Sequence, residues 1–154
     1  MDAVFKTEKG VFNYRVVGVW IIDNYVLLHR EAKDDHWSLP GGRVALMEES
    51  GVALKREFQE ELGIDVTVER LLWSVENFFQ YDHMDFHEIG LYYKVCAENH
   101  SLFSNEEFHG NEGERLIYKW IPIDELSQIT LYPEVIHQEL QRGLSDYPKH
   151  LVVR

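Results

Sequence analysis

The pattern of apolar positions along the chain predicts strands, then a helix, then more strands. From Tyr14 to Arg30 most residues are β-branched, aromatic or apolar, and Asp23-Asn24 interrupts them, which predicts a β-hairpin. The first arm, Val16 to Ile22, is apolar on both faces, as in a strand that is covered by two layers. Further strands are expected at Val66 to Leu72, Ser74 to Phe79, Phe86 to Cys96 and Leu116 to Ile121.

A helix is predicted between these groups of strands, beginning at Glu49 or Ser50 and ending at Leu62. Ser50 is of a residue type that caps helix N-termini, and Gly63 occupies the position where helices commonly stop. A second helix is expected from Pro133 to Gly143, because proline is favoured at the start of a helix. The buried stripe of the first helix consists of Leu54, Phe58 and Leu62, spaced four residues apart.

Shorter segments connect these elements. Trp37-Ser38-Leu39 is a short extended piece, and the chain is expected to turn at Pro40-Gly41-Gly42. Glu98 to Glu114 is predicted to be a polar loop, and Asp124-Glu125-Leu126 a single helical turn. The apolar tail, Leu151-Val152-Val153, receives no assignment.

The order of the elements and the length of the chain together predict the fold class. The 154 residues are 45% apolar, they contain no linker-like tract and no internal repeat, and they fit one domain over 1–154. Strands, a helix, further strands and a second helix predict an α/β fold. We expect a mixed central sheet with helices on both faces, which is an α/β/α sandwich.

Charge limits the kinds of partner. There are 15 basic and 27 acidic residues, and the formal net charge is −12, which is the opposite of the basic surface that polymeric nucleic acid requires. We therefore expect no polymeric nucleic-acid partner. A small anionic substrate would need a cation as intermediary, because a negative surface repels phosphates.

The sequence also predicts a cytoplasmic setting without membrane contact. The N-terminal residues lack the pattern of a signal peptide, and no apolar run approaches the ~18 residues of a membrane span. The one cysteine, Cys96, lies in an apolar run and is expected to be a structural thiol.

Three glutamates share one side of the first predicted helix. At roughly 100° per residue, Glu57, Glu60 and Glu61 fall within an arc of about 100°, where like charges cost a few tenths of a kcal/mol per pair. A divalent cation offsets this repulsion, and carboxylate oxygens without thiolate or imidazole partners favour Mg²⁺ or Mn²⁺. A solvated acidic face explains the same periodicity, and Glu60 points away from the apolar stripe, so the helix alone decides neither interpretation.

The wider spacing decides in favour of a site. Residues Gly42 to Ile64 read G(x5)E(x7)REFxEExGI, which resembles without mismatch the signature of the Nudix hydrolases. Each of the seven fixed positions has a chance of roughly one in twenty of matching at random. The odds of a chance match anywhere in ~150 residues are then of order one in ten million. The resemblance extends to Trp37 to Gly41, to the early hairpin and to Trp120 to Leu126, and it implies the family's α/β/α sandwich.

The resemblance implies roles for individual residues. Glu57, Glu60 and Glu61 would bind the Mg²⁺ or Mn²⁺ ions, with the carbonyl of Gly41 as a further ligand. Glu57 is the first candidate for the general base, and Glu60 belongs with it among the candidate catalytic residues. The remaining positions of the signature have supporting roles. Arg56 would hold the glutamates in place, Glu48 would sit near the metal site or brace the loop, and Gly42 would allow a close approach through an unusual backbone conformation.

Several residues outside the signature are further candidates. Glu88 begins a predicted strand and is a candidate auxiliary ligand or catalytic base, while Glu112 and Glu114 lie in a loop from which they could reach a substrate. His83 and His87 are four residues apart in an extended segment, which disfavours a zinc pair. Most aromatic residues between Trp73 and Tyr93 are expected in the core, with one or two available to stack on a nucleobase.

The function implied by the resemblance is attack of an activated water on phosphorus, which splits a nucleoside diphosphate from a linked group X. The partner is then a small nucleotide-like diphosphate, and a homodimer is the default assembly for an enzyme of this size. Two alternatives remain open. One is a nucleotide-sensing module that does not cleave, and the other is a pyrophosphohydrolase of RNA 5′ ends.

Overall fold

Strand β2 (Gly10–Ile22) is the centre of the fold, because its long apolar run is paired on both sides. The computed structural model describes residues 1–154. The sheet order is β7-β8-β3-β2-β6-β5-β9, with β1 and β4 also paired to β2. Two pairings, β2 with β6 and β5 with β9, are parallel and the others are antiparallel, so the sheet is mixed. The other strands are β1 (Val4–Lys6), β3 (Tyr25–Glu31), β4 (Gly41–Arg43), β5 (Thr67–Tyr81), β6 (Met84–Cys96), β7 (Phe108–His109), β8 (Leu116–Pro122) and β9 (Lys149–Val153).

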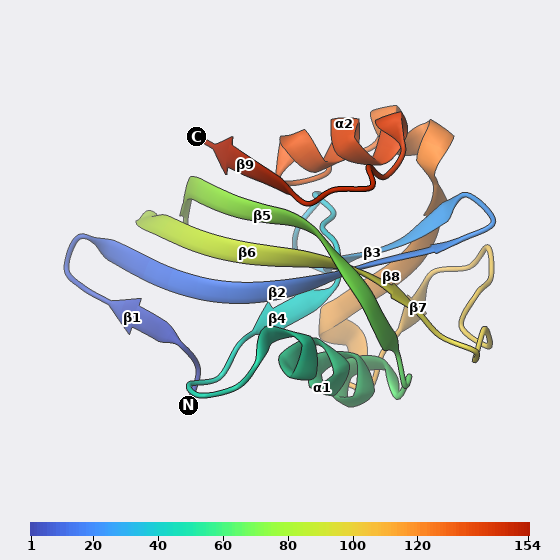
Figure 1. The fold of residues 1–154 in the computed structure, drawn as a ribbon, viewed down its shortest axis with the longest axis horizontal. Coiled ribbons are helices and arrows are strands. Elements are labelled where there is room, and N and C mark those ends of the chain that lie inside the picture. Colours follow the sequence, from blue (N-terminus) through green and yellow to red (C-terminus); the bar gives the residue numbers. More distant parts are fainter.

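Two helices cover opposite faces of this sheet (Figure 1), which confirms the predicted α/β/α arrangement. Successive residues of β2 alternate between the two layers: Val16 packs in the core with α1 (Ser50–Leu62), and Val17 packs in the core with α2 (Glu134–Arg142). Short 3₁₀ helices at Gly113–Arg115 and Ile123–Gln128 flank β8. None of the helices is long and apolar enough to cross a membrane.

The predicted strands on either side of Trp73 are one continuous strand, β5. Its pairing with β6 shifts register between Val68 and Arg70 and again between Leu71 and Trp73. These bulges explain why Leu72 and Trp73 are both buried although they are adjacent. The break in alternation therefore marks a bulge and does not end the strand.

Local details also differ from the prediction. Ser50 does not cap α1: the cap position is Glu49, and the Ser50 hydroxyl bonds Tyr93 Oη at 2.7 Å. The expected turn at Gly41-Gly42 is strand β4, the polar loop after Glu98 contains the short strand β7, and the unassigned tail is strand β9. Each of these strands forms by pairing with residues distant in sequence, which local patterns do not record.

Strand β2 changes partners along its length, and this change opens the fold for a site. Its earlier part pairs with β4, ending at Val17 opposite Gly41, and its later part pairs with β3, beginning at Ile21 opposite Val26. The two partners leave β2 in different directions, so the sheet splits between β3 and β4. α1 lies beside β4 at this split (Figure 1).

Candidate active site

Arg56 is the centre of a hydrogen-bond network that fixes the start of the site. Its Nε and Nη2 donate to the two carboxylate oxygens of Glu48 at 2.8 and 2.9 Å, and Nη1 donates to Glu57 Oε1 at 2.9 Å. Nη1 also reaches Glu60 Oε2 at 3.3 Å, and Nη2 reaches the carbonyl of Arg43 at 3.2 Å. The paired guanidinium lowers the pKa of Glu48 to about 2, so Arg56 joins the loop, the helix and β4 through charge-assisted bonds.

Glu57 and Glu61 form a close pair of carboxyl groups one helical turn apart. Burial raises the pKa of Glu61 to about 8, and the neighbouring Glu57 charge adds to the shift. Burial also raises the pKa of Glu57, against the lowering effect of Arg56. Glu61 is only 9% exposed and accepts a hydrogen bond from Tyr118 Oη at 3.1 Å. Both shifts favour a proton on the pair, because a proton or a cation is needed to reduce the repulsion between the two carboxylates.

Glu60 stands apart from this pair. Its side chain is 57% exposed, and its carboxylate contacts Arg56. No group of three or more acidic, histidine or cysteine side chains lies in an arrangement that could hold a metal ion. The structure thus brings two of the three predicted glutamates together and leaves the third at the surface of the helix.

The two glycines of β4 allow the backbone to lie directly against the carboxyl pair. A Cβ on Gly42 would collide with the Glu57 carboxyl group, and one on Gly41 would collide with the Val16 carbonyl. The predicted close approach at Gly42 is therefore present. The predicted unusual backbone is wrong: Gly42 has no positive φ, because it lies in a regular strand opposite Val16.

Strand pairing also determines where the Gly41 carbonyl points. Hydrogen bonds from Gly18 to Pro40 and from Val44 to Tyr14 connect β2 with β4. In an antiparallel ladder the residues between such bonds turn their backbone groups outward, so the carbonyls of Gly41 and Arg43 face away from β2. The Arg43 carbonyl accepts a bond from Arg56 on that side, and the Gly41 carbonyl faces the same way.

The pair opens into a cleft made of two adjoining hollows. The first, of about 520 Å³, contains Glu57 and Glu61 and is otherwise polar. The second, of about 560 Å³, is lined by aromatic side chains, among them Tyr92 and Tyr132. We call these the carboxyl end and the aromatic end of the cleft. Four residues line both ends and form the junction between them: Arg15, His36, Ser38 and Tyr81.

Glu88 lies at the aromatic end rather than beside the carboxyl pair. It is 8% exposed and accepts a bond from Asn13 Nδ2 at 2.7 Å. Asn13 Oδ1 in turn accepts a bond from Arg43 Nε at 3.0 Å, so Glu88 reaches the carboxyl end only through a chain of side chains. Glu112 pairs with Arg115 and contributes to the raised pKa of Glu61, whereas Glu114 is exposed.

Three residues that line or support the cleft were missed from the sequence. Arg15 lines both ends and makes no ion pair or side-chain hydrogen bond, so its charge faces the cleft. Tyr118 supports Glu61. His29 is buried, and burial with nearby arginines lowers its pKa to about 3, which keeps it neutral. Arg15 had a signal, since it is a charged residue in a strand that is otherwise largely apolar.

The donors at the carboxyl end fit a divalent cation of the magnesium type. Glu57 and Glu61 offer hard oxygen ligands at one point, and the Gly41 carbonyl faces the same side of β4. A cation there would replace the shared proton and relieve the repulsion between the two carboxylates.

Comparisons with known proteins agree with this geometry. Residues 13–140 match the family model described as NUDIX domain. An 8-oxo-dGTP diphosphatase from Buchnera aphidicola subsp. Schizaphis graminum is 28% identical over 116 residues, which is 72% of this chain and 78% of that protein.

Solved structures with the same fold include two with different names. A MutT NUDIX hydrolase from Burkholderia pseudomallei is 26% identical, with a TM-score of 0.61 over 84% of this chain and 97% of that one. An ADP-ribose pyrophosphatase from Streptococcus suis is 17% identical, with a TM-score of 0.57 over 91% of this chain and 98% of that one. This chain therefore shares its fold with both of these proteins.

Proposed function

Because the chain belongs to the Nudix hydrolase family, we propose that it uses Mg²⁺ or Mn²⁺ to hydrolyse the diphosphate linkage in a nucleoside diphosphate joined to a group X. The observation that carries this proposal is the close pair of the half-buried Glu57 and the buried Glu61 at the carboxyl end of the cleft. Two carboxyl groups in mutual contact are not explained by packing. The free-energy cost of keeping both of them ionised side by side is offset when a divalent cation binds.

Glu57, Glu61 and the Gly41 carbonyl would hold the metal. When bound, it supplies positive charge for the diphosphate and a water that loses its proton readily. Glu60 completes the proposed set of ligands and candidate catalytic groups, although its carboxylate must first leave Arg56, from which it is 3.3 Å distant. That contact is exposed and therefore weak.

Glu57 is the proposed general base, because it lies between Arg56 and Glu61 and faces the cleft. Arg56 is a positioning residue: its bond to Glu57 at 2.9 Å sets the direction of the carboxylate, and its two bonds to Glu48 fix its own position. Glu88 is the alternative base or auxiliary ligand, and it would act from the aromatic end through the second hollow.

Arg15 is proposed to hold the diphosphate across the middle of the cleft. It is the one residue at the junction of the two ends that is always charged, and it makes no ion pair within the chain. A guanidinium with free donors binds phosphate oxygens in a bidentate manner. Arg115 also lines the carboxyl end, but Glu31 and Glu112 already occupy its donors.

The nucleoside or the X group would lie at the aromatic end. Tyr81 forms part of the wall there, and the His36 and Tyr132 rings lie opposite one another at 5.1 Å. Such rings accept planar bases without selecting one by hydrogen bonding alone. Names of similar proteins include an oxidised purine nucleotide and ADP-ribose, which sets the composition of the test panel.

The test is a panel of nucleoside triphosphates, 8-oxo-dGTP, ADP-ribose and nucleotide sugars, with release of phosphate, pyrophosphate or nucleoside monophosphate measured with and without Mg²⁺ or Mn²⁺. We expect hydrolysis of at least one substrate that is abolished by metal chelation. The variants Glu57→Gln, Glu60→Gln and Glu61→Gln should each lower kcat by about 100-fold or more, because each removes a carboxylate from the metal site.

The matched control is Glu49→Gln, an exposed glutamate just before the same helix. It should keep full activity. Full activity in Glu57→Gln and Glu61→Gln, with metal independence, would refute the proposed function.

A further inference from the structure

One face of the sheet extends beyond α1 and has no layer over it. The ends of β2, β5 and β6 continue past the helix together with β1 (Figure 1). Phe12, Phe78, Ile89 and Leu91 point to this face at alternate positions of their strands and are only partly buried. None of these four side chains belongs to either hydrophobic core. Their apolar surface therefore lacks a partner within the chain.

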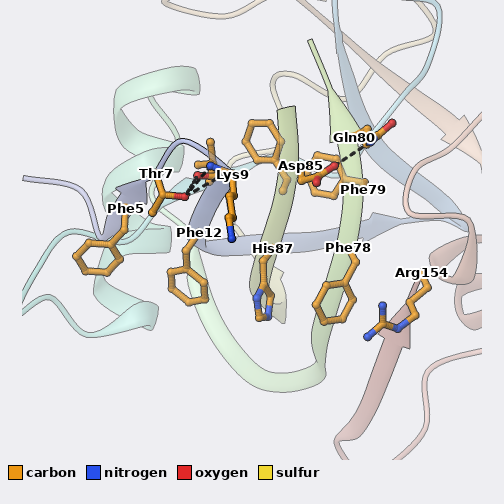
Figure 2. A pocket seen from close by; sticks show the side chains of 13 residues that line it. Phe5, Thr7, Lys9, Phe12, Phe78, Phe79, Gln80, Asp85, His87 and Arg154 are labelled. Atoms are coloured by element: carbon orange, nitrogen blue, oxygen red, sulfur yellow. Dashed lines mark hydrogen bonds between the residues drawn. The ribbon is translucent and has the colours of Figure 1, made fainter. Parts of the chain in front are cut away.

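A row of rings crosses this face at right angles to the strands. The register aligns Phe5 with Phe12, Phe12 with His87, and His87 with Phe78. The centroid distances are 6.2, 5.4 and 4.5 Å in that order, and the Arg154 guanidinium lies 4.4 Å from the Phe78 centroid. Figure 2 shows these five side chains projecting on the same side of the strands, around a hollow of about 810 Å³.

The row is suited to a flat apolar partner rather than to a stacked base. Phe78 has His87 on one side and Arg154 on the other, so the faces of the central rings are already in use. What the row presents is a line of ring edges, flanked by Ile89 and Leu91. Flat sheet faces of this kind pack on other flat sheet faces.

Charge favours a second copy of this chain. A molecule with a net charge of −12 repels its copies over most of its surface. Around the row the charged groups of the hollow are Lys9, Arg154 and Asp85, and Asp85 accepts a bond from Gln80 at 2.8 Å. Further along the face, Glu76 is paired with His150 at 2.8 Å. Two copies meeting at this face would therefore bring no unpaired acidic side chains into contact.

We propose that this face, which we call the aromatic face (Phe5, Phe12, Phe78, His87, Ile89 and Leu91, with Arg154 at its edge), binds a second copy of the chain about a two-fold axis beside His87. An axis in the interface, parallel to the strands, reverses the order of the row. Phe12 then meets the partner's Phe78, and Phe5 meets the partner's Arg154, where an exposed ring accepts a cation. The row is complementary to its own reverse.

The size of the face sets the expected strength of this dimer. Strands are about 4.8 Å apart, so five strands and three alternate positions along them span roughly 20 Å by 20 Å, or about 400 Å² on each copy. Interfaces of this size are at the small end of those that are specific. We therefore expect a dissociation constant in the micromolar range, with monomers at high dilution.

Sedimentation velocity between about 1 and 200 µM tests the proposal. The chain should change from monomer to dimer, and Phe12→Glu should remain monomeric throughout while keeping its thermal midpoint within a few degrees. Tyr147→Glu is the matched control, since Tyr147 is an aromatic residue 77% exposed outside the face, and it should dimerise normally. A wild-type chain that is monomeric at all concentrations, or dimers that persist in Phe12→Glu, overturns the proposal.

The direction of the row is tested at Phe5. Phe5→Lys places a lysine opposite the partner's Arg154, so two cations repel, and the dimer should be weakened by about 10-fold or more. Phe5→Glu forms an ion pair with the partner's Arg154 and should weaken the dimer much less. Equal effects of the two variants contradict the reversed row.

The axis is tested by crosslinking in a Cys96→Ala background. A short bismaleimide should join His87→Cys subunits across the axis. Tyr147→Cys, at the exposed position outside the face, should remain uncrosslinked. The opposite result places the contact elsewhere.

Discussion

The two ends of the cleft are built in different ways. The candidate metal ligands of the carboxyl end, Glu57, Glu61 and the Gly41 carbonyl, come from one stretch, Gly41 to Glu61, in which a strand, a braced loop and a helix are held together by Arg56. The aromatic end is assembled from separate segments that contribute Leu39, Glu88, Tyr92 and Tyr132, besides the four residues that it shares with the carboxyl end. The contiguous end is fixed by many local bonds, whereas the assembled end depends on tertiary packing. We expect the chemistry to depend on the first and substrate preference on the second.

The largest effect should follow from a change of one methyl group at the carboxyl end. In Gly42→Ala the new Cβ displaces the Glu57 carboxyl group, so kcat should fall by about 100-fold, comparable to the loss of one electrostatic group in an active site. Stability should change little, because the displaced group is the flexible end of a side chain. Steady-state kinetics with thermal unfolding separates the two.

Gly51→Ala is the control for this substitution. Its Cβ would lie 4.0 Å from the nearest atom, a methyl of Val68, and alanine is favoured over glycine within a helix. It should retain activity and gain a little stability. Equal losses in Gly42→Ala and Gly51→Ala would contradict the close approach as the cause.

The next effect concerns the junction of the two ends. Arg15→Gln removes an unpaired charge from the cleft and should lower kcat/KM by roughly 10- to 100-fold, as expected for a charge-assisted bond of about 1.5–3 kcal/mol. Folding should not suffer, because Arg15 has no partner in the chain. Arg154→Gln, at the rim of the aromatic end, is the comparison and should have a much smaller effect on kcat/KM.

A smaller effect concerns stability and pH. The pKa of Glu61 is raised to about 8 by burial, against an ordinary value of 4.5, so between these values the folded chain holds a proton that the unfolded chain has released. Metal-free stability should therefore fall as pH rises from 6.5 to 8, by up to about 2 kcal/mol at about 1.4 kcal/mol per pH unit. Urea unfolding in chelator measures it, and Glu61→Gln should flatten the slope.

This pH window also separates Glu61 from the buried histidine. The pKa of His29 is lowered to about 3 from 6.5, so its contribution is complete above pH 6.5 and is lost as pH falls below that value. Its slope has the opposite sign and lies outside the window. A slope between pH 6.5 and 8 that survives in Glu61→Gln would show that another group is responsible.

The smallest effect belongs to the aromatic end. Tyr81→Leu removes one ring from the wall while leaving the others, so KM for a nucleotide substrate should rise only a few-fold, with kcat unchanged, because stacking of one ring contributes about 0.5–1.5 kcal/mol. A large fall in kcat would show that the two ends are not separable in function.

The difference between the two ends of the cleft also explains which parts of the site could be predicted from the sequence. The spacing from Gly42 to Ile64 predicted the helix and placed Glu57, Glu60 and Glu61 on one side of it, because these residues lie within a few turns of one another. It could not separate Glu60 from Glu61: both fall in one arc, and only the contact with Tyr118 shows which is buried. The three glutamates do lie on one side of the helix, but the residue that distinguishes Glu61 from Glu60, Tyr118, comes from a distant part of the chain.

Which residues come together at the aromatic end could not be predicted from the sequence, for a physical reason. Arg15 and Tyr81 line the same cleft only because β2 pairs with β6 and β6 pairs with β5. The position of Glu88, facing the second hollow beside Asn13, likewise depends on register. The segment of β4 was predicted as a turn and that of β9 received no assignment, because three to five residues carry too little periodicity to be recognised as strands.

The central claim, that Glu57 and Glu61 form a divalent-cation site, is tested most directly by calorimetric titration of the chain with Mn²⁺ in the absence of substrate. We predict saturable binding that also raises the thermal midpoint, is lost in Glu61→Gln, and is unchanged in Glu49→Gln. Absence of saturable binding to the wild-type chain, or equal binding by Glu61→Gln, would contradict the claim.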